Sequence, residues 1–200
     1  MKTLPMTNAD LVFRWGRALD RKHKRKPVNT LVIHLEDPST DCLSVIYSGR
    51  GWKVVRTQPE QEELERLLAE HDRIIMLGHG SPTGLFGSHT SYSAFAIGER
   101  EAHLLRNKSN IYIWCYASSY VQKHGLAGFA SGMFISEVGE AHVMGVKTTS
   151  SQVFESNRVF SESVGRHVDD PQVCQKVIKD YGAVDSDVAR YNLARLQQFS

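Results

Sequence analysis

The clearest pattern in this chain is a pair of continuously apolar runs at residues 74–80 and 111–118, which read IIMLGHG and IYIWCYAS. Short runs without polar alternation are typical of strands in a parallel sheet, because both faces of such a sheet are covered. One chemically capable side chain stands near the end of each run, His79 in the first and Cys115 in the second. If the two strands are neighbours, both side chains reach the crevice beyond the carboxyl ends, where open α/β sheets place their sites.

Along the rest of the chain, apolar runs alternate with helical periodicities. This alternation predicts an α/β fold, a three-layer sandwich with a mostly parallel central sheet. The clearest helix is the acidic amphipathic stretch at 59–70, whose leucines share one face. A glycine-rich loop or hairpin is expected at 81–93. Besides the two apolar runs, the expected strands are 30–35, 52–57 and 141–146, and the expected helices are 9–20, 40–47, 59–70, 99–106, 122–131, 152–168, 171–181 and 184–198.

Composition indicates one compact domain. The 200 residues are 41% hydrophobic, which is enough to bury a substantial core. The basic run at 21–26 and the proline after it separate an N-terminal helix and linker at 1–28 from a single α/β domain at 29–200. The net charge of +2 favours neither nucleic-acid binding nor a membrane surface.

Cysteine usage and apolar run length bear on the compartment. Three cysteines without CxxC spacing indicate reduced thiols rather than a disulfide framework. The N-terminus has no continuous apolar core of a signal peptide, and no apolar run approaches about 18 residues. We therefore expect a cytoplasmic protein that neither enters nor crosses a membrane, and the oligomeric state is left open. The cysteines are Cys42, Cys115 and Cys174.

A cysteine beside a histidine is a nucleophile beside a base. An ordinary thiol, with a pKa of about 8.5, is mostly protonated at neutral pH, and a nearby imidazole is the usual means of activating it. The glycine after the histidine, Gly80, lets a substrate carbonyl approach the backbone, and its N–H with that of Cys115 is expected to form an oxyanion hole. Taken singly, a cysteine at a strand end is more often a buried structural residue. The occurrence of a histidine and a cysteine at corresponding ends of two apolar runs instead favours a catalytic role for the pair.

The two motifs, IIMLGHGS and IYIWCYASS, resemble those of the caspase-fold cysteine peptidases, which include caspases, metacaspases, gingipains, separases and CHAT domains. In that group one hydrophobic strand ends in His-Gly and a later one in the nucleophilic cysteine. The similarity in element order extends over residues 29–146. It implies a caspase-like domain in which Cys115 attacks a peptide carbonyl, His79 transfers the protons and a thioester is hydrolysed, without a metal or other cofactor.

The same resemblance implies a pocket for the substrate side chain before the scissile bond, supplied by the loop after the first strand. Glu36 and Asp37 stand there, and a carboxylate would favour a Lys or Arg side chain through a charge-assisted hydrogen bond. The alternative for Asp37 is to cap the next helix, as Asp, Ser and Thr commonly do. Ser81, which follows the His-Gly pair, is also expected to bind substrate.

Two alternatives remain open. Small residues often follow the cysteine in the caspase-fold group, whereas this chain has Tyr116. A tyrosine that blocks the cleft would leave a catalytically silent module that binds a protein partner through the aromatic loop with Phe86, Tyr92 and Phe95. The His-Gly-Ser sequence also resembles the metal-insertion site of sirohydrochlorin chelatases, where it follows the first strand rather than the third. No HExxH or similar ligand spacing occurs among the nine histidines, so no metal site is expected.

Overall fold

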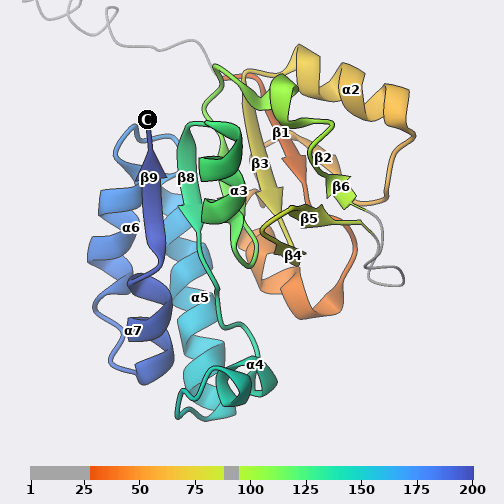
Figure 1. The fold of residues 1–200 in the computed structure, drawn as a ribbon. Helices are drawn as coiled ribbons and strands as arrows, with labels where there is room; N and C mark the ends of the chain where they lie inside the picture. The colour runs from red at the N-terminus through yellow and green to blue at the C-terminus, as the bar shows by residue number, and fades with distance from the viewer. Residues whose placement is uncertain (1–27, 88–94) are drawn as a thin grey trace, which may run out of the picture.

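A six-stranded sheet forms the centre of the computed structural model, which describes residues 28–87 and 95–200 (Figure 1). The strand order is β2-β1-β3-β7-β8-β9. Neighbours from β2 to β8 are parallel, and β9 runs antiparallel to β8. The predicted α/β fold with a mostly parallel sheet is confirmed, while the expected helix at 9–20 lies outside the described residues. The strands are β1 (Thr30–Ile33), β2 (Lys53–Val55), β3 (Arg73–Leu77), β7 (Ile111–Ile113), β8 (Gly128–Ser131) and β9 (Leu196–Phe199).

Helices cover both faces of this sheet (Figure 1). Successive side chains of a strand point to opposite faces, so Ile74 joins the core under one helical layer and Ile75 the core under the other. Both faces are therefore dry, which explains why the strands lack polar alternation. One layer contains α2 (Gln61–Glu70), η2 (Ala102–Leu105) and α3 (Ala117–His124), and the other contains η1 (Pro38–Ile46), α5 (Ser150–His167), α6 (Val173–Tyr181) and α7 (Asp187–Leu193).

Two segments have a different secondary structure from the one expected. The segment 122–131, expected to be helical, contains only the end of α3 and then β8. Gly125 ends the helix in a left-handed conformation with φ of 60°. Conversely, the strand expected at 141–146 falls mainly within helix α4 (Val138–Val143), whose start is closed by a capping box between Glu137 and Glu140. Neither prediction was correct, because short apolar runs do not distinguish a strand from a buried helix.

Further strands are formed by the C-terminal segment and by the loop after His79. The helix expected at 184–198 is interrupted, since α7 ends at Leu193 and β9 then pairs with β8. The hairpin expected within 81–93 is present as β4 (Gly80–Ser81) and β5 (Gly84–Phe86), which form a small sheet with β6 (Phe95–Ile97). Residues 88–94 lie outside the described part of the chain. None of the described helices combines the length and apolar character needed to cross a bilayer.

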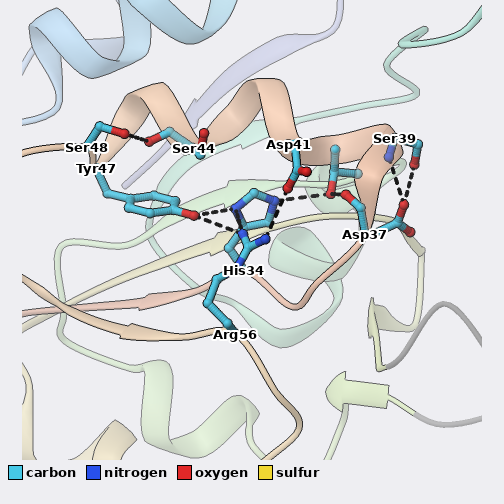
Figure 2. Close-up of polar contacts among 9 residues, drawn as sticks. His34, Asp37, Ser39, Asp41, Ser44, Tyr47, Ser48 and Arg56 are labelled. Carbon is cyan, nitrogen blue, oxygen red and sulfur yellow. Dashed lines mark hydrogen bonds and ion pairs between the residues drawn. The ribbon is translucent and has the colours of Figure 1, made fainter.

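A buried histidine joins β1, β2 and η1 (Figure 2). The Arg56 guanidinium donates to Nδ1 of His34 at 2.9 Å, so this nitrogen must be the acceptor. Nε2 then carries the proton and donates to Oγ1 of Thr40 at 3.1 Å. Burial, with the Arg56 charge acting in the same direction, lowers the pKa of His34 to about 4. This histidine is therefore a neutral structural residue at neutral pH.

We expect His34 to make the protein sensitive to mild acid. Unfolded chains take up this proton near pH 6.5, whereas the folded protein does so only near pH 4, so stability falls as the pH is lowered through this window. The shift corresponds to roughly 3 kcal/mol of unfolding free energy. Urea unfolding across this range should show the loss in the wild type and in a control with the exposed His103 changed to Gln. An identical loss in His34→Gln would contradict the prediction.

Candidate active site

Strands β3 and β7 are hydrogen-bonded neighbours, which is the condition under which the two apolar runs bring His79 and Cys115 to one crevice. Leu77 pairs with Ile113 in parallel register, and the Gly78 N–H continues the ladder by donating to the Ile113 carbonyl at 3.1 Å. His79 and Cys115 each lie two residues beyond this pair, so they occupy equivalent positions at the carboxyl edge of the sheet. The structure thus brings together the two residues on which the sequence prediction of a nucleophile and base depended.

Both side chains line one cavity between η1 and α5. The cavity has a volume of about 30 Å³, enough for about one water molecule, and the surrounding non-atom space reaches about 420 Å³ only when the open mouth is included. Its wall is largely apolar, with polar groups near His79 and near Ser136 and Asn157. No carboxylate belongs to the described lining of this cavity. The lining residues beside the pair are Ser39, Thr40, Cys42, Leu43, Gly78, Ile113, Trp114, Phe134, Ser136, Asn157 and Phe160.

Cys115 holds its proton in this state. Its Sγ donates to the Phe134 carbonyl at 3.5 Å. Burial raises the pKa of the thiol to about 11, and the negative charge of Glu140 acts in the same direction. At neutral pH the group is therefore a thiol, and it needs a base to become a nucleophile.

The imidazole of His79 is hydrogen-bonded to the segment that follows β1. Its Nε2 lies 2.7 Å from Oγ of Ser39 and 3.8 Å from a carboxylate oxygen of Asp37. Asp37 also accepts from the Ser39 backbone N–H at 3.0 Å and from the Ser39 hydroxyl at 2.7 Å. Asp37 is thus the N-cap of η1, which confirms the capping alternative, and it lies beside the histidine as well.

Among the described residues, no hydrogen bond joins His79 to Cys115, since the thiol faces Phe134 and the Nε2 atom faces Ser39. In enzymes without substrate, catalytic hydrogen bonds are often long and shorten only when the substrate binds. Both residues line the same cavity, so a substrate carbonyl that entered its mouth would come near both.

The remaining predicted residues, Gly80, Ser81, Glu36 and Asp37, do not belong to the described lining of this cavity. Gly80 lies in β4 under the indole of Trp114, and Ser81 accepts a hydrogen bond from the Trp114 Nε1 atom at 3.1 Å. The Ser81 hydroxyl is hydrogen-bonded to that of Thr83. Glu36 is exposed, and Asp37 lines a smaller adjoining cavity that His79 also borders. Their roles in the oxyanion hole and in substrate binding stay predictions.

Tyr116 does not belong to the described lining of the cavity. It takes a left-handed conformation with φ of 67° at the N-cap of α3, which turns the chain away from the direction of β7. Its side chain is 39% exposed. The bulky residue after the cysteine therefore leaves the space beside the thiol unfilled.

Two residues of the site were missed from sequence. Ser39 belongs to no motif in the sequence, although it follows the strand next to β3 and so emerges at the same edge of the sheet as His79. Asn157 gave no signal, because it lies within the long helix α5. Its side-chain nitrogen donates to the Ser136 carbonyl, and its buried Oδ1 has no hydrogen-bond partner among the described residues.

No family model, curated protein or solved structure matches this chain. The resemblance to caspase-fold peptidases therefore stays a prediction.

Proposed function

We propose that this protein is a cysteine peptidase with Cys115 as nucleophile and His79 as general base and acid. The observation that supports this most is the equivalent placement of the two residues on neighbouring parallel strands, with both side chains on the wall of one cavity. Reactive groups at the carboxyl ends of adjacent strands are the usual arrangement of sites in open α/β sheets.

The chemistry requires two proton transfers at the imidazole. As Sγ of Cys115 attacks a peptide carbonyl, the thiol proton passes to His79, and the carbonyl oxygen becomes an oxyanion. Collapse breaks the C–N bond, His79 returns the proton to the leaving amine, and a thioester remains. A water molecule, deprotonated by His79, then attacks the thioester and releases the acid and the thiol. Because burial raises the pKa of Cys115 to about 11, attack without the base would be very slow at neutral pH.

The proposal includes a preference for the substrate residue before the scissile bond. The predicted pocket of Glu36 and Asp37 favours a Lys or Arg residue before the scissile bond, and Asp37 does border the cavity next to His79. The wall nearest the thiol, with Leu43, Phe134 and Phe160, is apolar instead. A pair of otherwise identical probes that differ only in this residue separates the two expectations.

The second candidate is a catalytically silent module that binds a protein partner. The observation that favours it is the protonated thiol, which donates to the Phe134 carbonyl rather than to the histidine. A structural cysteine would behave in the same way, with a raised pKa and little reactivity.

Covalent labelling decides between these candidates. The purified protein is treated with two peptidyl acyloxymethyl ketones, one with lysine and one with leucine at the reactive position, and the adduct is located by intact mass and peptide mapping. We expect a single thioether on Cys115 in the wild type, none in Cys115→Ala and strongly slowed labelling in His79→Ala. Labelling that is absent at Cys115 with both probes, or equal at Cys42 and Cys174, would favour the silent module.

A further inference from the structure

We infer that Ser39 and Asp37 form a relay that positions His79, holding its neutral ring in the tautomer with the proton on Nε2 and with Nδ1 as the basic nitrogen. This assignment rests on the proposed peptidase function. Ser39 and Asp37 act here through the histidine, so they are positioning residues rather than groups that react.

The hydrogen-bond directions follow from the chemistry of the three groups. An ionised carboxylate can only accept, so the single hydroxyl proton of Ser39 points to the Asp37 Oδ1 atom at 2.7 Å. The hydroxyl oxygen is then the acceptor for the His79 Nε2 atom, which lies 2.7 Å away. The nitrogen that faces Ser39 must therefore carry the proton. In the neutral ring the other nitrogen, Nδ1, is left as the proton acceptor.

The backbone holds this relay in place. Asp37 takes an extended conformation as the N-cap of η1, and Pro38 follows at the first helical position. Both the N–H and the hydroxyl of Ser39 bond to the same carboxylate oxygen, which restricts the serine to one orientation. Figure 2 shows Asp37 and Ser39 together at one end of η1, with Tyr47 and Ser48 at the other end. Since β1 lies next to β3, the start of η1 is carried to the edge at which His79 emerges.

Two features place the relay in the site rather than only in a helix cap. Ser39 lines the same cavity as Cys115, so its contact with His79 lies at the wall that a substrate would meet. The carboxylate is also 3.8 Å from Nε2, close enough to stabilise the imidazolium that forms after proton transfer. A cap alone needs only the Ser39 N–H and does not require the serine hydroxyl.

Ser39 is itself within hydrogen-bond distance of the imidazole, as a serine nucleophile would be. Its proton, however, goes to Asp37, and the carboxylate lies on the same side of the ring as the serine. A base that activates a serine is normally oriented by a carboxylate at its opposite nitrogen. The geometry therefore favours the positioning role.

The tautomer is tested directly by two-bond ¹⁵N–¹H correlation spectra of ¹⁵N-histidine protein at about pH 8.5, where an ordinary imidazole is neutral. The His79 signals are assigned by their loss in His79→Gln. We expect the Nε2–H pattern in the wild type and in Ser39→Thr, which keeps the hydroxyl, and a mixture of tautomers in Ser39→Ala. Ser48→Ala, at the far end of η1, is the matched control and should give the wild-type spectrum.

Labelling kinetics at Cys115 provide the second measurement. Ser39→Ala and Asp37→Asn are expected to slow acyloxymethyl ketone labelling about tenfold to a hundredfold and to change its pH profile, with Ser39→Thr largely restored. Both slowed variants keep a cap acceptor for the Ser39 N–H, so thermal unfolding should confirm that they are folded.

The two measurements distinguish a failure of the relay from a failure of the proposed peptidase function. If no variant, including the wild type, labels at Cys115, the proposed peptidase is wrong, yet the spectra still report whether the relay sets the tautomer. If Cys115 labels but Ser39→Ala leaves both the tautomer and the labelling rate unchanged, the relay is overturned and the peptidase stands. An Nδ1–H tautomer in the wild type, or an adduct on Ser39, also overturns the relay.

Discussion

Cys115→Ala is expected to lower peptide hydrolysis by at least about a thousandfold, to the limit of detection, while the protein stays folded. The reason is that, among the described residues of the cavity wall, only Cys115 is a cysteine at a strand position equivalent to that of His79. The measurement is the release of a fluorophore from a peptide chosen by the labelling experiment. Cys174→Ala is the control, because this cysteine lies in α6, is buried in the core and does not belong to the described lining of the cavity.

The companion variant His79→Ala tests whether the histidine is the base. With the base removed, reaction depends on the thiolate that forms spontaneously, and the pKa of Cys115 near 11 makes this fraction very small at neutral pH. The residual rate of His79→Ala should therefore rise with pH towards about 11, whereas the wild type should already be active near neutrality. Hydrolysis by Cys115→Ala at the wild-type rate would remove the proposed function altogether.

Gly80→Ala is expected to destabilise the protein by about 3 kcal/mol, at the upper end of ordinary overpacking. A Cβ at this position would lie 2.2 Å from Cδ1 of Trp114 and 2.6 Å from the Gly84 carbonyl oxygen. The indole cannot move aside easily, because it is fully buried and its Nε1 atom donates to the Ser81 carbonyl. The small β4-β5 sheet must then separate from the end of β7.

Chemical unfolding of Gly80→Ala beside Gly139→Ala measures this effect. Gly139 lies in helix α4, and no atom of the described residues lies within 4 Å of an added Cβ, so alanine there should be neutral or slightly stabilising. Equal stabilities of the two variants would show that Trp114 does not pack on Gly80 as described. If Gly80→Ala folds but loses labelling at Cys115, the glycine also matters for the site.

The fold class and the pair of reactive residues followed from local patterns. A strand covered on both faces must be apolar at every position, so the runs that became β3 and β7 are visible without any tertiary information. Residues just beyond such strands emerge at the carboxyl edge, which placed His79 and Cys115. The long helices α5 and α6 were found for a similar reason, since their periodicity extends over several turns.

The sequence by itself determined what depends on neighbours along the chain: the apolar strands, the amphipathic helices and the two side chains that end the central strands. Only the tertiary structure decided what depends on distant partners. The short segment Gly128–Ser131 is a strand because β7 and β9 supply its hydrogen bonds on either side, not because of its own pattern. Ser39 likewise meets His79 because β1 and β3 pair in the sheet, across 40 residues of sequence. Local periodicity carries no record of such pairings, since the free energy that selects them comes from burial and hydrogen bonding between remote segments.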